Sequence, residues 1–273
     1  MKPIKLWLAT MATLWCSLTA SAYDFEVNGI YYNLVSASDL TVEVTSGDNY
    51  YSGDVIIPST INYSGKTMTV TGIGHDTFWG CSGLTSISIP STITNIATSA
   101  FSYCEGTIDI VVESDNTVYD SRNNCNAIIE TSSNTLIAGF YNTTIPNSIT
   151  SIGNNAFEGC YGLTSITIPN SVISIGNNAF WGCSGLTSIT IGNSVTNIGY
   201  RAFDGCNAIE KLELNCPTIE SWFYGKPFVK EVIIGNSVTS IGNSAFAYCS
   251  RLTSVTVGDS VTSIGNSAFT NSI

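Results

Sequence analysis

Cysteine is the residue type with the greatest chemical potential in this sequence, since thiols can pair, bind metals or act as nucleophiles. Zinc sites need closely spaced cysteines or paired histidines, and a nucleophilic cysteine needs a base such as histidine. His75 is the only histidine and lies in a turn-like stretch. Six cysteines instead stand three residues after a recurring phenylalanine: Cys81, Cys104, Cys160, Cys183, Cys206 and Cys249. We expect a column of buried free thiols and no metal or cofactor, with bridges such as Cys160–Cys183 as the alternative.

Carboxylates are the second group that could do chemistry. One set surrounds an irregular segment and could bind calcium, although the EF-hand spacing is absent: Asp115, Asp120 and Glu130. A second set could supply the carboxylate pair of a glycosidase: Asp204, Glu210, Glu213 and Glu220. Nothing in the sequence places two of these in one cleft. The sequence therefore predicts a protein that is not an enzyme.

The composition favours β-structure and excludes one class of partner. Only 11% of the 273 residues are charged, roughly half the usual share, and Ser, Thr and Asn supply polarity as in strands and tight turns. The net charge is −11, and it becomes −13 when a leader carrying two lysines is removed. A polyanion would be repelled, so we expect no nucleic-acid partner.

Residues 1–22 have the pattern of a secretory signal peptide. Lys2 and Lys5 precede an apolar run from Leu6 to Leu18, and Ala20-Ser21-Ala22 provides small residues for cleavage. The apolar run is too short for a membrane span. We expect a secreted chain whose mature part does not insert into a membrane.

A repeat of about 23 residues occupies most of the remaining chain. It combines an Ile-Gly-x-x-Ala-Phe turn with a strand of the form L-x-x-I-x-I, such as 163–168. Alternation along that strand points Leu163, Ile166 and Ile168 to the interior and Ser165 and Thr167 outward. A single repeat buries too little apolar surface to fold alone, so successive repeats must stack. The pattern predicts a β-rich repeat solenoid.

The repeat also indicates how the chain is divided. Residues 23–72 differ from the repeat. We expect them to form an N-terminal β-hairpin cap together with the first rung, that is, the first strand of the stacked ladder, because Asn28-Gly29 favours a two-residue hairpin turn. We expect residues 73–273 to form the solenoid, with irregular repeats at 113–145 and 215–228. Within the first irregular repeat, 125–139 reads as a second hairpin.

The run "LTSITIPNSVISIGNNAFWGC" (163–183) resembles the BspA-like, Treponema-type leucine-rich repeats of bacterial surface proteins. The resemblance covers about residues 54–273, with Ala-Phe-x-x-Cys in register with L-x-x-I-x-I. It implies a leucine-rich-repeat arc with a parallel sheet on its concave side. It also implies a bacterial cell-surface role in adhesion to host extracellular-matrix proteins or other cells.

Candidate binding residues are those that depart from the repeat on the outer surface. The outward strand positions are mostly Ser and Thr, as at Ser165 and Thr167, and the same strand position is expected at Asn142 and Thr144. Tryptophans beside the repeat phenylalanine are either binding residues or packed across a turn. The candidates are Lys211, Glu213, Glu231, Ile233, Trp79, Trp181 and Trp222. We expect an extracellular protein ligand. The alternatives are a glycan-binding module that uses Trp79 and Trp181, and a truncated repeat fragment without a partner of its own.

Overall fold

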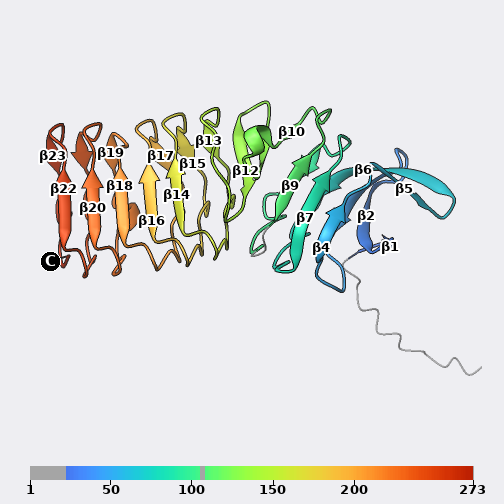
Figure 1. Cartoon of the computed structure of the whole chain (residues 1–273), viewed down its shortest axis with the longest axis horizontal. Helices are drawn as coiled ribbons and strands as arrows, with labels where there is room; N and C mark the ends of the chain where they lie inside the picture. Colours follow the sequence, from blue (N-terminus) through green and yellow to red (C-terminus); the bar gives the residue numbers. More distant parts are fainter. Residues whose placement is uncertain (1–22, 105–107, 273) are drawn as a thin grey trace, which may run out of the picture.

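The protein is an elongated β-solenoid in which successive coils lie side by side (Figure 1). The computed structural model describes residues 23–104 and 108–272. The predicted signal peptide at 1–22 lies outside the described residues.

The long strands of the repeats form a parallel ladder in two sheets. The first sheet contains β4 (Gly53–Ile56), β7 (Leu84–Ile89) and β9 (Asp109–Val112), and the second contains β14 (Ser165–Ile168), β16 (Ser188–Ile191), β18 (Lys211–Leu214), β20 (Glu231–Ile234) and β22 (Ser254–Val257). Neighbouring strands pair one repeat apart, as Ile166 with Ile189. Leu163 and Ile166 are buried and Ser165 is exposed. The predicted phase of the strand is confirmed.

Two-residue strands pair in parallel on the other side of the coils, in two separate sheets. They are β13 (Ser151–Ile152), β15 (Ser174–Ile175) and β17 (Asn197–Ile198), then β19 (Thr218–Ile219), β21 (Ser240–Ile241) and β23 (Ser263–Ile264). Asparagine side chains join the adjoining turns. The side-chain oxygen of Asn154 accepts from the amide of Asn177, and that of Asn177 accepts from the amide of Tyr200, both at 2.8 Å. These bonds join three successive turns.

The N-terminal strands form a mixed sheet at the blue end of the stack (Figure 1). They are β1 (Phe25–Val27), β2 (Ile30–Ser36), β3 (Thr41–Thr45), β5 (Thr60–Tyr63), β6 (Lys66–Ile73) and β8 (Asn95–Ile96). β1 and β2 pair antiparallel around Asn28 and Gly29, whose φ angles of +51° and +80° suit a tight hairpin turn. This confirms the hairpin predicted there. β8 pairs in parallel with β6 and belongs to this sheet.

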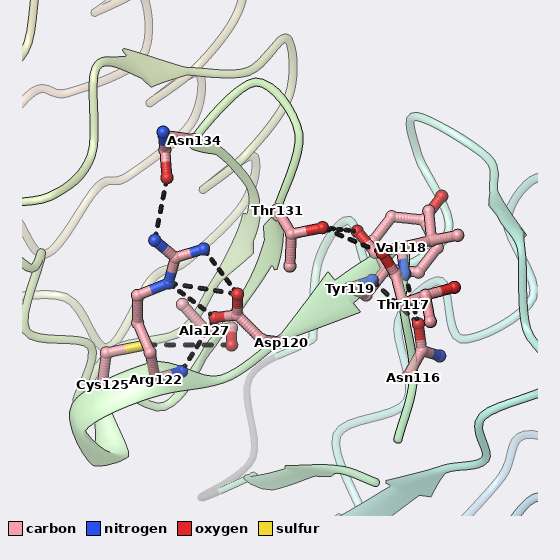
Figure 2. A network of polar contacts seen from close by, with 10 residues as sticks. All are labelled: Asn116, Thr117, Val118, Tyr119, Asp120, Arg122, Cys125, Ala127, Thr131 and Asn134. Atoms are coloured by element: carbon pink, nitrogen blue, oxygen red, sulfur yellow. Dashed lines mark hydrogen bonds and ion pairs between the residues drawn. The ribbon is translucent and has the colours of Figure 1, made fainter. Parts of the chain in front are cut away.

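The predicted hairpin at 125–139 is present and interrupts the long-strand ladder. This region contains β10 (Tyr119–Asp120), a short 3₁₀ helix η1 (Arg122–Asn124), β11 (Ala127–Glu130) and β12 (Thr135–Gly139). Figure 2 shows Arg122 between Asp120 and Asn134, donating to one oxygen of each at 2.8 Å. Residues 142–145, which the repeat pattern placed in the same strand column, form no strand. The side chain of Asn126 instead bonds the backbone of Ile110 and Ile108.

The interior contains a stack of phenylalanine rings with the thiols beside it. The Phe180 ring centroid lies 4.9 Å from that of Phe157 and 5.4 Å from that of Phe203. The Cys183 thiol donates to the carbonyl oxygen of Phe157 at 3.0 Å. The cysteines of the described residues are free and buried: Cys81, Cys104, Cys125, Cys160, Cys183, Cys206, Cys216 and Cys249. The predicted thiol column is therefore confirmed, without the bridges considered as its alternative.

Candidate binding surfaces

Four of the candidate residues lie together on the outward face of two neighbouring strands. β18 and β20 pair Lys211 with Glu231 and Glu213 with Ile233. The ammonium of Lys211 is 3.1 Å from a carboxylate oxygen of Glu231. All four side chains are at least partly exposed. We call Lys211, Glu213, Glu231 and Ile233 the strand patch.

The strands on either side of the strand patch present small hydroxyl side chains. On β16 the residues in line with Lys211 and Glu213 are Ser188 and Thr190. On β22 the residues in line with Glu231 and Ile233 are Ser254 and Thr256. The strand patch therefore interrupts a Ser/Thr surface on a rigid ladder.

Two further candidates, Trp79 and Trp181, are brought together by a residue that the sequence pattern did not single out. The Tyr103 ring centroid lies 5.4 Å from that of Trp79 and 6.0 Å from that of Trp181. The ring of Tyr161 lies 5.9 Å from the Tyr103 ring. Trp79 is 44% exposed and Tyr161 is 38% exposed, so this aromatic cluster reaches the surface.

The cluster forms because two turns that are distant in sequence are neighbours in the stack. The amide of Tyr103 donates to the carbonyl oxygen of Glu158 at 2.9 Å. The ring of Tyr103 covers Gly159, where an added Cβ would lie 2.5 Å from a ring atom. Tyr103 also has a φ of +62° at the place where the repeat usually has glycine. That substitution of tyrosine for the recurring glycine is the signal that could have revealed the residue.

The remaining candidate, Trp222, belongs to the second irregular repeat. The 3₁₀ helix η2 (Ser221–Phe223) replaces the usual turn in the shortened repeat. Trp222 is partly buried and lines a hollow of about 370 Å³ together with Tyr200, Arg201 and Asp204. Arg201 and Asp204 form a long ion pair of 3.7 Å across exposed side chains, which contributes little to folding.

Two further features bear on chemistry at these surfaces. Within residues 23–104 and 108–272, no three His, Cys, Asp or Glu side chains form a group that could hold a metal ion. Over the same residues, no helix has the length and apolar character needed to cross a membrane. His75 is exposed, and its Nδ1 lies 3.4 Å from the Ser99 hydroxyl, as expected for a polar turn residue.

The chain is similar to solved bacterial proteins with leucine-rich repeats. A leucine-rich repeat protein from Eubacterium ventriosum is 23% identical with a TM-score of 0.56, over 81% of this chain and 65% of that one. This chain thus spans less than two thirds of the Eubacterium protein. A T. pallidum leucine-rich repeat protein is 22% identical with a TM-score of 0.44, over 84% of this chain and 91% of that one. No curated protein matches.

The model of the BspA type leucine rich repeat region matches in six copies, at residues 59–137, 129–222 and 219–273. These matches span the regular repeats and both irregular ones. The chain therefore belongs to the BspA-type leucine-rich repeat family.

Proposed function

We propose that this chain is a non-catalytic extracellular protein that binds another protein through the strand patch. The observation that carries the proposal is the pairing of Lys211 with Glu231 and of Glu213 with Ile233 on neighbouring strands. Exposed ion pairs contribute at most about 1 kcal/mol to folding, so stability alone gives little reason for charges in a Ser/Thr surface. Charge patterns across an interface do fix specificity and orientation.

The geometry of the strand patch suits recognition of a folded protein. The strands are held in register by the ladder, so the backbone positions of the four residues are fixed before binding. A second ion pair, Lys230 with Glu210 at 2.7 Å, lies at the beginning of the same two strands. Alternating charges beside the apolar Ile233 present both polar and apolar contacts to a partner.

Secretion and adhesion are part of the same proposal. The leader pattern at 1–22 supports export, and membership of the BspA-type family supports a protein-binding role at the bacterial surface. The ligand that we propose is an extracellular-matrix protein or a protein on another cell.

A solid-phase binding assay tests this function. Residues 23–273 would be applied to immobilised matrix proteins and to intact cells, alongside three variants: Lys211→Glu, the double exchange Lys211→Glu with Glu231→Lys, and Thr167→Ala on β14. We expect Lys211→Glu to weaken binding about tenfold or more. The double exchange should restore the ion pair and the fold yet leave binding weak, because the partner meets reversed charges. Thr167→Ala should bind normally.

Binding that is equal for all four proteins would refute the strand patch as the binding site. The absence of binding to any matrix protein or cell would support the alternative of a repeat fragment without its own partner.

A further inference from the structure

A second surface lies near the N-terminal sheet, around Tyr50 and Trp79. The Tyr50 side chain is 68% exposed, and the Trp79 side chain is 44% exposed. Tyr50 lies beside the turn that carries Trp79, since a Cβ added to Gly80 would lie 3.6 Å from its ring. Two large aromatic side chains thus project from adjoining loops.

Two hollows adjoin each other at Tyr50. One has a volume of about 340 Å³ and reaches from Asp48 to Trp79 and Asp76. The other has a volume of about 410 Å³ and reaches to Asp54 and Ile56, at the outer edge of β4. Both are lined by Asn49 and Tyr50, so the Tyr50 ring forms a ridge between them. Each volume falls in the ~300–1,000 Å³ range of small-molecule sites.

The polar side chains that line these hollows include carboxylates, the amides of Asn28 and Asn49, and hydroxyls. Asp48 accepts a hydrogen bond from the hydroxyl of Tyr23 at 2.9 Å. Asp54 accepts from the hydroxyls of Thr85 and Ser86 at 2.7 Å through a single oxygen. A carboxylate has about four lone-pair positions, so the bonded carboxylates are oriented and retain capacity to accept from a ligand. The hydrogen bonds from Ser86 and Thr85 lower the pKa of Asp54, so its carboxylate stays ionised in mildly acidic solution.

Charge limits the ligands that these hollows can accept. The residues lining them include Asp48, Asp54 and Asp76 and include no lysine or arginine. The whole chain has a net charge of −11. Anionic ligands such as acidic polysaccharides or phosphates would therefore be repelled.

Aromatic ridges beside hydrogen-bond acceptors match the chemistry of a sugar. A pyranose ring has an apolar face of C–H groups that packs on an aromatic ring, and its rim of hydroxyls donates to carboxylates and accepts from amides. The aromatic cluster extends this surface, because Tyr103 joins Trp79 to Trp181. Tyr103 adopts the left-handed backbone of this repeat position, with a φ of +62° where Gly80 has +66°.

We propose that the Tyr50–Trp79 surface binds a neutral oligosaccharide, with one sugar unit in each hollow and the Tyr50 ring between them. This site is separate from the strand patch and does not depend on it. A cationic peptide would also suit aromatic rings beside carboxylates, but it would bind through charge rather than through hydroxyls. The two occupants therefore differ in their response to salt.

The test uses residues 23–273 with a panel of neutral hexasaccharides: cello-, manno-, laminari- and chitohexaose. Polygalacturonate and hexalysine serve as the anionic and cationic comparisons. Binding would be followed by calorimetry and by tryptophan emission at about 50 mM and 500 mM salt. We expect at least one neutral hexasaccharide to bind with an affinity that changes less than about twofold between these salt concentrations.

The variants are chosen to separate this site from the strand patch. Trp79→Ala and Tyr50→Ala should each weaken the oligosaccharide about tenfold or more, as expected for aromatic binding residues. Trp79→Phe should retain part of the affinity and controls for folding. Tyr200→Ala removes another tyrosine with 71% exposure and should have no effect. Lys211→Glu should leave oligosaccharide binding unchanged, and Trp79→Ala should leave protein binding unchanged.

Three results would overturn the proposal. The first is that no neutral hexasaccharide binds at millimolar concentration. The second is that neither Trp79→Ala nor Tyr50→Ala changes the affinity for the oligosaccharide. The third is that hexalysine alone binds, with an affinity that depends on salt. The last result would assign the surface to a cationic peptide.

Discussion

The ammonium of Lys226 donates to the carbonyl oxygen of Phe203 at 2.8 Å. In the neighbouring repeats a cysteine thiol makes this bond, from Cys206 to Phe180 at 3.0 Å and from Cys249 to Phe223 at 3.4 Å. Lys226 stands three residues after Phe223, in the cysteine position of the shortened repeat. It is buried, unlike most lysines. Lys226 therefore takes the place of the cysteine thiol as the side-chain donor to the phenylalanine carbonyl of the preceding repeat.

Removing the donor at Lys226 should destabilise the stack. Lys226→Met keeps much of the length but removes the ammonium donor, so that the Phe203 carbonyl retains only its bond from the backbone amide of Cys206. We expect a loss of about 1–3 kcal/mol in the free energy of unfolding by urea. Lys226→Cys restores the donor of the regular repeat and should cost less. Lys211→Met, at an exposed position, should stay within about 0.5 kcal/mol of the parent. A loss for Lys226→Met no larger than that of Lys211→Met would show that the bond is unimportant.

Two glycines of the phenylalanine turn should differ in their tolerance of alanine. Both have positive φ angles, +76° at Gly205 and +66° at Gly80, which cost a non-glycine residue roughly 1–2 kcal/mol. A Cβ at Gly205 would also lie 2.9 Å from the Cα of Gly182, whereas one at Gly80 would meet only the Tyr50 ring at 3.6 Å. Gly205→Ala should therefore be the more destabilising change, by at least about 1 kcal/mol in a urea titration. Equal losses would mean that the backbones of adjacent turns do not approach as closely as described.

The thiol column predicts a loss of stability in alkaline solution. Burial raises the pKa of Cys81 from 9.0 to about 11 and that of Cys160 to about 12. A pKa raised by folding stabilises the fold fully below the unfolded value of about 9, and that stabilisation is lost as pH rises through the folded value. Each such thiol should contribute a loss of roughly 1 kcal/mol between pH 8 and 10.

A serine variant separates the thiols from other alkaline effects. Burial raises the pKa of Cys183 as well, and Cys183→Ser removes the ionising group while keeping a donor. The chain has this arrangement at Ser272, whose hydroxyl donates to Phe246 at 2.5 Å. Urea titrations at pH 8 and 10 should show a smaller alkaline loss for Cys183→Ser than for the parent. If the two lose the same stability, thiol ionisation is not the cause.

The regular parts of this fold could be read from the sequence because one residue pattern repeats. The phase of 163–168, the Phe180 stack and the thiol column each follow from side-chain alternation and a fixed period. The Asn28-Gly29 hairpin follows from turn chemistry alone. In these places local preference and the stacked arrangement favour the same conformation.

The irregular parts could not be read in this way, because neighbours in space are no longer one period apart. The hairpin β11–β12 lets the turns of Phe101 and Phe157 meet, so Trp79 joins Trp181 through Tyr103. The strand expected at 142–145 is absent, and the Asn126 side chain bonds the backbone of Ile108 and Ile110 beside it. The sequence does not indicate that Lys226 occupies the cysteine position, because lysine and cysteine differ in size and charge. Their equivalence rests on the same kind of acceptor, a phenylalanine carbonyl of the preceding repeat.

The distance between positions 165 and 254 tests most directly whether the coils stack in register across the shortened repeat. Ser165 and Ser254 are exposed and lie in one row through Ser188, Lys211 and Glu231. Spin labels on cysteines introduced at Ser165 and Ser254 would react selectively, because the native thiols are buried. Four spacings of about 4.8 Å predict a narrow distance distribution centred near 19 Å, broadened by the label arms. A broad distribution, or a centre beyond about 30 Å, would contradict an in-register ladder and the binding surfaces built on it.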